Sequence, residues 1–315
     1  MSEERKQDTK RSTIHDRLYV GFQGAYDATD KHVSRRPALT EDFKNIDFFA
    51  MLLPECFPSD FDSLKKIWYF PILEAGLELE YSVFFAKAGV CKVAYMCLRN
   101  FLELSLVCFH YLLLAKAKGN TWVKGQSPTP FKKEILSVLF DNPDFQHFDQ
   151  ATHLKDRINC QYGELSDICH TRGQPCSHAT LSKANFPRLV EESLDRYVDR
   201  TKEVIDLVII CFVVSINPII LFPLPVEEKF GMNGPMSGFL EEYQVKVLHR
   251  LLKPESLKHL LKYYEFDPGV ASFQQWFEEM PDITEEEFKR QLEDFDKFMK
   301  DMGPKNVSSK DPANK

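Results

Sequence analysis

Apolar side chains recur every three to four residues along most of this chain, as expected for α-helices that bury one face. The spacing predicts helices over about 72–87, 90–118, 130–140, 145–169, 187–215, 240–252 and 254–264. The second of these is hydrophobic around most of its circumference, which is typical of a helix in the middle of a bundle. No run alternates between apolar and polar residues as a half-buried strand would, so the sequence predicts an all-α fold.

Polarity and proline content divide the chain into four segments. Residues 1–40 are polar and aperiodic, and are predicted to form a flexible N-terminal arm. The helical bundle is assigned to 41–225, and its Phe-rich beginning at 43–61 is interrupted by two prolines and expected to lack long regular structure. The Gly/Pro/Asn-rich run KFGMNGPMSGF connects the bundle to a helical C-terminal extension over 226–302, and 303–315 is predicted to be a disordered tail.

The last predicted helix is amphipathic. Thr284 and Glu287 form a capping box, in which each side chain bonds to the other residue's backbone N–H. The helix then places acidic residues on one face and four apolar residues on the other, namely Phe288, Leu292, Phe295 and Met299. Such an apolar face docks on the bundle of its own chain or on another protein.

Composition narrows the class of function. The 315 residues include 47 acidic and 40 basic ones, and the net charge of −7 argues against a surface built mainly to hold polyanions. The chain has only 13 glycines and contains no P-loop, paired-glycine fingerprint, HExxH or GxSxG motif. No cofactor is therefore predicted.

Two features bear on the compartment. The N-terminal run MSEERKQDTKRS is charged and lacks the apolar segment of a secretory signal. The eight cysteines form no CxxC pair, and most lie in apolar helical stretches, where reduced thiols behave as small hydrophobic groups. Both features predict a cytoplasmic protein.

The apolar run from Leu207 to Leu224 approaches the length of a membrane span, about 20 residues. Asn217, Pro218 and Pro223 interrupt it. Because such residues are costly in lipid, a helix that enters the protein core and ends in a proline-rich turn is the preferred interpretation. Membrane attachment through 207–224 stays an alternative.

One face of the predicted helix over 90–118 carries polar side chains three, four or seven residues apart. They are Lys92, Tyr95, Arg99, Glu103 and His110. Arg99 and Glu103 would be costly to bury alone, so they are expected to pair with each other or across the bundle. A structural ion pair is the simpler interpretation, and the wall of a functional site is the alternative.

A second candidate group lies in the segment YGELSDICHTRG. Tyr162, Ser166 and His170 are four residues apart and share a helix face. His170 falls in the last turn, where a protonated imidazole interacts favourably with the negative end of the helix dipole. The histidine therefore serves either as a C-terminal cap or as a general acid and base, which requires a group titrating near neutral pH.

The segments LRNFLE and YGELSDICHTRG resemble those of HEPN-like domains, which occur in prokaryotic defence and toxin systems. The resemblance covers about residues 65–220. It implies an antiparallel helical bundle that pairs as a dimer, here followed by a helical C-terminal extension. Active members of the family are metal-independent RNases whose motif is an arginine, four to six residues, and a histidine.

Under this resemblance, His170 matches the family histidine and Glu103 its acidic partner on an earlier helix. The motif arginine is missing, because the positions where it should lie hold Gly163, Glu164 and Leu165. Catalysis would then need an arginine supplied in space, and the candidates are Arg172, Arg157 and Arg99.

A Cys/His group surrounds the end of the same segment. It consists of Cys169, His170, Cys176 and His178. The spacing does not match a known zinc pattern and no CxxC pair accompanies it, so no metal site is predicted.

The sequence thus favours a non-catalytic helical interaction or regulatory module, a component of a prokaryotic antiphage defence system by the resemblance. Its ligand would be a protein partner or a second copy of the chain. The alternative is a variant metal-independent RNase that binds RNA. In that enzyme His170 is the general acid and base, an arginine such as Arg99 stabilises the developing charge, and Ser166 or Tyr162 positions the phosphate.

Overall fold

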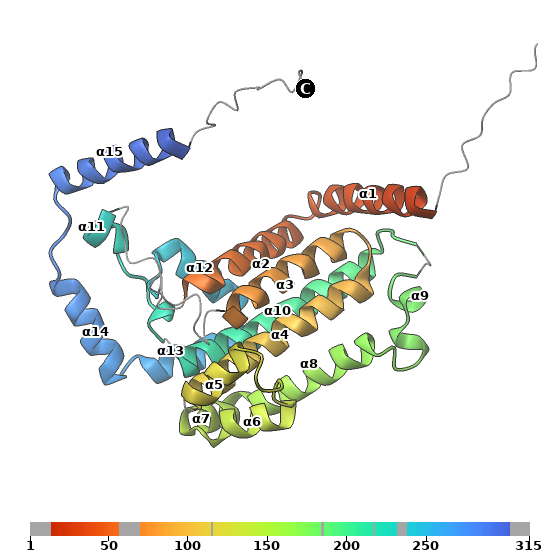
Figure 1. Cartoon of the computed structure of the whole chain (residues 1–315), viewed down its shortest axis with the longest axis horizontal. Coiled ribbons are helices and arrows are strands. Elements are labelled where there is room, and N and C mark those ends of the chain that lie inside the picture. Colours follow the sequence, from red (N-terminus) through yellow and green to blue (C-terminus); the bar gives the residue numbers. More distant parts are fainter. Residues whose placement is uncertain are drawn as a thin grey trace, which may run out of the picture.

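The computed structural model describes residues 14–56, 70–114, 116–183, 186–216, 218–231 and 238–302. All the regular secondary structure in these ranges is helical, which confirms the predicted all-α fold. Figure 1 shows long helices lying side by side in the bundle, with the last helices of the chain extending away from it. The predicted tail at 303–315 and the first 13 residues of the predicted arm lie outside the described residues.

Helix α4 lies in the middle of the bundle. Three other long helices pack against it, namely α3, α8 and α10, and α2 packs on α3 (Figure 1). The bounds are α2 (Pro37–Glu55), α3 (Phe70–Lys87), α4 (Cys91–Leu113), α8 (Leu154–Cys169) and α10 (Glu191–Ser215). The α4 side chains Leu98, Phe101 and Leu102 are fully buried, because neighbouring helices cover most of its circumference.

A sharp turn joins α3 to α4, and glycine is required in it. Gly89 has a φ of 74°. A Cβ atom there would lie 2.5 Å from the backbone oxygen of Arg188, which crosses the turn. This close approach holds the chain entering α10 against the α3–α4 connection.

The first part of the apolar run that suggested a membrane span lies inside the protein. All side chains from Leu207 to Val214 are buried against the rest of the core. In the described part of the chain, one helix is long and apolar enough to cross a membrane by length and composition. It is α4, with a mean hydropathy of 1.3 and 56% of its residues in that window buried. The core helix of a soluble protein passes the same test.

Two segments expected to lack long regular structure are helical. Helix α1 (Ile14–Val33) occupies part of the predicted arm, and its buried stripe consists of Ala25, Thr29 and Val33. These small residues give little hydrophobic signal, which is why the sequence pattern missed the helix. Helix α2 covers most of the Phe-rich stretch. Pro37 lies in its first turn, where proline is well tolerated, and Pro54 lies next to its last residue, so the helix ends just after it.

Several boundaries differ from the predicted ones. The helix predicted over 145–169 is divided at His153, which adopts a left-handed backbone with a φ of 51°. Gly119 does not end the preceding helix but lies within a short one after it. The elements concerned are α5 (Lys116–Val123), α6 (Lys132–Asp141), α7 (Pro143–Thr152), η2 (Gln174–Cys176) and α9 (His178–Leu181).

The C-terminal helices fall into a packed and a projecting set. The elements are η3 (Pro218–Leu221), α11 (Val226–Phe230), α12 (Glu242–Leu251), α13 (Pro254–Tyr264), α14 (Pro268–Glu279) and α15 (Glu285–Met302). Helices α12 and α13 pack on α2, α7 and α10, and their buried side chains join the core of the bundle. Helices α14 and α15 extend away from it (Figure 1). The sequence pattern did not predict α14.

Candidate functional site

Four of the five predicted site residues meet where α4 faces α8. Arg99 donates from Nε to Ser166 Oγ at 3.1 Å and from Nη2 to Tyr162 Oη at 3.0 Å. Its Nη1 lies 2.8 Å from Glu103 Oε2, and Tyr162 Oη donates to Glu103 Oε1 at 3.0 Å. We call these four residues the Arg99 cluster. Each of its side chains has a partner within it.

Helical spacing on each side produces this arrangement. Arg99 and Glu103 are one turn apart on α4, and Tyr162 and Ser166 are one turn apart on α8. Packing of the two helices brings the two pairs together across a sequence separation of 59 to 67 residues. The side chains of Arg99 and Glu103 are 20% and 27% exposed, so the cluster lies at the edge of the core.

Two cations lie close to the Tyr162 ring. The guanidinium carbon of Arg99 lies 5.1 Å from the ring centre and the Lys132 ammonium 5.2 Å from it. Burial raises the pKa of the Tyr162 phenol, and the nearby Glu103 carboxylate raises it further. Tyr162 therefore keeps its proton at neutral pH and acts as a hydrogen-bond donor to Glu103.

His170, the fifth predicted residue, stays outside the cluster. It is the C-cap of α8 and its side chain is exposed. Its backbone N–H donates to Ser166 O at 3.0 Å. The imidazole itself makes no hydrogen bond or ion pair with any residue that the structure describes. Its position fits the predicted cap, and general acid–base chemistry there would require a substrate that reaches it from solvent.

Of the three candidate arginines, Arg99 of α4 contacts the last turns of α8, which lead to His170. Arg157 is engaged with Glu203 and Asp206 of α10, and Arg172 pairs with Asp167. Arg99 instead contacts Ser166, one turn before the histidine.

The other polar residues on the predicted face of α4 do not join this cluster. Lys92 is buried and donates to Thr171 Oγ1 in the turn after α8. His110 is buried beside Tyr111, burial lowers its pKa, and its Nδ1 has no hydrogen-bond partner in the described structure. Tyr95 faces α10. The polar residues on this face of α4 thus contact several different neighbours and do not form a single site.

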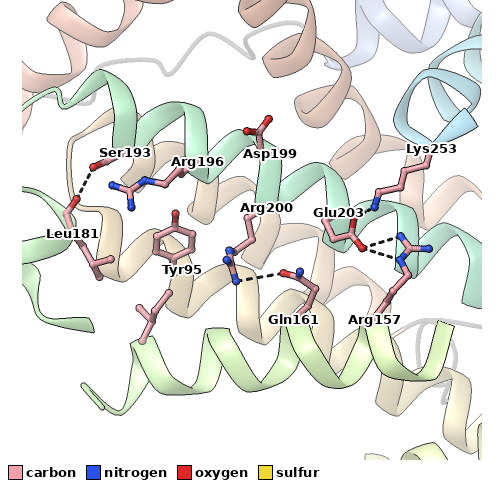
Figure 2. Close-up of a pocket in the computed structure, with 11 residues that line it drawn as sticks. Tyr95, Arg157, Gln161, Leu181, Ser193, Arg196, Asp199, Arg200, Glu203 and Lys253 are labelled. Atoms are coloured by element: carbon pink, nitrogen blue, oxygen red, sulfur yellow. Dashed lines mark hydrogen bonds and ion pairs between the residues drawn. The ribbon is translucent and has the colours of Figure 1, made fainter. Parts of the chain in front are cut away.

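A groove of about 520 Å³ runs between α8 and α10, with α4 at its base (Figure 2). At one end Arg157 donates to Glu203 at 2.9 Å and also binds Asp206, while Lys253 pairs with Glu203. At the other end the lining residues are Tyr95, Ile168, Leu181, Ser193, Arg196 and Arg200. We call these two ends the Arg157 end and the Arg196 end.

The sequence analysis missed this groove, although α10 carries a signal for it. Arg196, Arg200 and Glu203 are spaced at i, i+4 and i+7 and therefore share one face of the helix. The apolar face of the same segment is the stronger signal in the sequence. The depth of the groove depends on how α8 packs, which the pattern does not specify.

The Cys/His group near the end of α8 does not form a metal site. Cys169, Cys176 and His178 belong to three consecutive elements. Over the described ranges, no three His, Cys, Asp or Glu side chains lie close enough together to hold a metal ion. The described cysteines are all free thiols, and burial raises the pKa of the Cys169 thiol.

Comparison with known proteins gives no relative for this architecture. No protein-family model, curated protein or solved structure matches the chain. The HEPN-like relationship stays a prediction carried by the segments LRNFLE and YGELSDICHTRG, and the site is interpreted from its own geometry.

Proposed function

We propose that this protein is a non-catalytic helical interaction module, and that α15 is the element that binds its protein partner. The observation that carries the proposal is the exposed apolar stripe of α15. Phe288, Leu292 and Phe295 are 39%, 42% and 47% exposed, although they occupy the face that an amphipathic helix normally buries.

Helix α15 has limited support from its own chain. Gln291 Nε2 donates to Phe230 O at 3.0 Å, which holds one side of α15 near α11. The capping box fixes its first turn, because Thr284 N donates to Glu287 Oε2 at 3.1 Å and Glu287 N to Thr284 Oγ1 at 3.2 Å. The helix is therefore ordered at its start. Phe288 lies close to Gly231 of its own chain, whereas Leu292 and Phe295 are more exposed and stay open to a partner.

Charge selects the kind of partner. Helix α15 contains seven acidic and four basic residues, a net charge of −3. Two copies of α15 packed together would oppose like charges, which is unfavourable. We therefore propose a basic amphipathic helix of another protein, whose apolar side chains cover the stripe while its lysines and arginines face the acidic residues.

The Arg99 cluster supports a non-catalytic role. The guanidinium of Arg99 already donates to Ser166 and Tyr162 and pairs with Glu103. A group already bound by neighbouring side chains must break those contacts before it can stabilise charge on a substrate.

The test uses two synthetic probes, an amphipathic peptide of leucine and lysine and its counterpart of leucine and glutamate. We expect the lysine peptide to bind the full chain in a fluorescence polarisation assay and the glutamate peptide not to bind. The double variant Leu292→Asn/Phe295→Ser should weaken binding at least about tenfold, because it removes apolar contact area. Phe266→Ser is the control, because Phe266 is an exposed aromatic residue, 80% accessible, that lies outside α15.

Equal binding of both peptides, or binding that the double variant leaves unchanged, would contradict the proposal. Light scattering covers the alternative of a homodimer. We expect a monomer, and a dimer that Leu292→Asn/Phe295→Ser dissociates would show that the partner is a second copy.

The HEPN-like assignment of residues 65–220, the place in a prokaryotic antiphage defence system and the cytoplasmic location belong to the same proposal. The long helices support the assignment, with an Arg/Glu pair on α4 and a Ser/His pair on α8. Fractionation tests the location, since recovery only with membranes would favour the alternative of attachment through 207–224.

A variant RNase is the second candidate, and the position of Arg99 favours it. Its guanidinium binds Ser166 one turn before His170, so α4 brings an arginine to the region where the sequence motif lacks one. Purified wild type, His170→Ala and Arg99→Gln are incubated with tRNA, rRNA and mRNA. Cleavage by wild type that both variants abolish, with unchanged melting curves, would establish the RNase. Intact RNA in every sample supports the interaction module.

A further inference from the structure

We infer that the Arg196 end of the groove between α8 and α10 binds a small organic phosphate, with the phosphate held by Arg196, Arg200 and Tyr95. This inference is independent of α15 and its partner. It rests on Arg196, which has no ion-pair partner in the described structure, and on Tyr95 and Arg200, which line the same groove next to apolar side chains (Figure 2).

The two arginines are one helical turn apart on α10 and share a face of the helix. Arg200 already pairs with Glu164 and donates to Gln161, so it must give up part of these contacts to join Arg196 on an anion. Figure 2 shows the Tyr95 hydroxyl directed towards α10, between the guanidinium groups of Arg196 and Arg200. Two guanidinium groups supply donors only, a protonated phenol can donate as well as accept, and a phosphate dianion supplies acceptors only. The two arginines therefore fit a phosphate, and the Tyr95 hydroxyl can donate to the same ligand.

Tyr95 is the least expected member of the set. Its side chain is 6% exposed, and its hydroxyl makes no hydrogen bond with any other residue in the described ranges. The residue as a whole is buried, but Tyr95 lines the groove, where a ligand can reach its hydroxyl. Burial raises the pKa of Tyr95 to about 12, so the phenol is protonated and can donate to a ligand oxygen.

The carboxylates around the groove leave Arg196 available. Glu203 is bound by Arg157 and Lys253, and Glu164 pairs with Arg200. Arg196 donates to the backbone oxygen of Glu192 at 3.3 Å and makes no ion pair within the described structure. Asp199 also lines the groove, and its negative charge would weaken the binding of an anion there. Neutralising Asp199 should therefore strengthen binding if the ligand is an anion.

The walls of this end indicate an organic ligand rather than a bare ion. Ile168 and Leu181 line it together with the Tyr95 ring. The groove volume of about 520 Å³ lies within the range of small-molecule pockets, about 300–1,000 Å³. A phosphate ester with a ring or short carbon body would place its phosphate on the arginines and its body against these side chains.

The probes are adenosine monophosphate, ribose 5-phosphate, inorganic phosphate and adenosine, measured by isothermal titration calorimetry with the full chain. We expect the two phosphate esters to bind, inorganic phosphate to bind more weakly, and adenosine not to bind. Arg196→Gln should weaken ester binding about tenfold or more, and Tyr95→Phe by about three- to tenfold, because each removes a donor. Asp199→Asn should strengthen it severalfold by removing a repelling charge.

Arg250→Gln is the matched control. It removes the same charge from an exposed arginine of α12 that pairs with Glu41, and it should leave binding unchanged. Melting curves establish that each variant is folded. The inference is overturned if no phosphate ester binds at millimolar concentration, or if binding is insensitive to both Arg196→Gln and Asp199→Asn. Inorganic phosphate binding as tightly as the esters would overturn the organic part of the inference.

Discussion

Helix α8 borders two arginine-centred groups, and they differ in how far water reaches their carboxylates. On one side Asp206 is fully buried; it accepts from the backbone N–H of Lys253 at 2.7 Å and from Ser256 Oγ at 3.1 Å, and it binds Arg157. On the other side the Glu103 side chain is 27% exposed and binds Arg99. Both groups cross between helices, but only the first has a charge that water cannot stabilise if its partner is lost.

This difference indicates that the group around Asp206 stabilises the fold, whereas the Arg99 cluster can lose a contact at a smaller cost in stability. The group around Asp206 joins α8, α10 and the start of α13, so it connects the bundle to the C-terminal helices. The Arg99 cluster joins α4 and α8 alone and lies at the edge of the core. Removing one partner of a buried ion pair strongly lowers the stability of the fold, because the remaining charge has no solvent. In a partly exposed pair, water solvates the remaining charge and the loss is smaller.

The largest effect is expected for Asp206→Ala. The substitution leaves Arg157 short of a partner in a buried position and frees the Lys253 N–H and the Ser256 hydroxyl. We expect the free energy of unfolding to fall by about 3–5 kcal/mol, measured by urea denaturation. Asp167→Ala, which removes the exposed partner of Arg172, is the control and should change stability by less than about 0.5 kcal/mol. A loss below about 1 kcal/mol for Asp206→Ala would contradict the structural role.

The next effect depends on pH and concerns Tyr95, which lies one turn before Arg99 on α4 but faces the groove. Burial raises its pKa from 10.0 to about 12, so the folded state holds the proton more tightly than the unfolded state. The stabilisation is fully present below pH 10 and is lost as the pH rises to about 12. Wild type should lose up to about 2–3 kcal/mol more stability than Tyr95→Phe over that range. Parallel pH profiles for the two proteins would show that Tyr95 is not the group responsible.

A smaller effect is expected for Arg99→Ala. Glu103, Tyr162 and Ser166 lose their shared donor, but water can replace part of its contacts. We expect a loss of about 1–3 kcal/mol in the free energy of unfolding, below that of Asp206→Ala. A double-mutant cycle with Tyr162→Phe measures the coupling across the helices, and we expect about 0.5–1.5 kcal/mol. If Arg99→Ala lowered the free energy of unfolding as much as Asp206→Ala, the two groups would not differ in their contribution to stability.

The smallest effect is expected for His170→Ala. The imidazole is exposed and makes no hydrogen bond or ion pair with the described residues, so stability should change by less than about 0.5 kcal/mol. Thermal denaturation at pH 7 measures this change. A larger loss would show that the histidine has a structural partner in solution, and the RNA cleavage assay on the same variant would then lose its value as a test of catalysis.

The sequence by itself determined the features that depend on neighbours along the chain. The helical period predicted the all-α fold, the Arg99–Glu103 pair and the amphipathic face of α15, and Thr284 with Glu287 marked where that helix begins. Residues three or four apart on a helix meet whatever else the chain does. Where the apolar stripe was made of small residues, as at Ala25 and Thr29 in α1, even this local signal was too weak.

Only the tertiary structure decided which helix faces meet. It brought Arg99 to Tyr162 and Ser166, left His170 outside their cluster, and opened the groove beside Arg196. These outcomes depend on the rotation of α4, α8 and α10 about their axes, which many packed side chains fix together. A small rotation of one helix exchanges the residues that face its neighbour, so contacts between segments some 60 residues apart follow from packing and not from spacing along the chain.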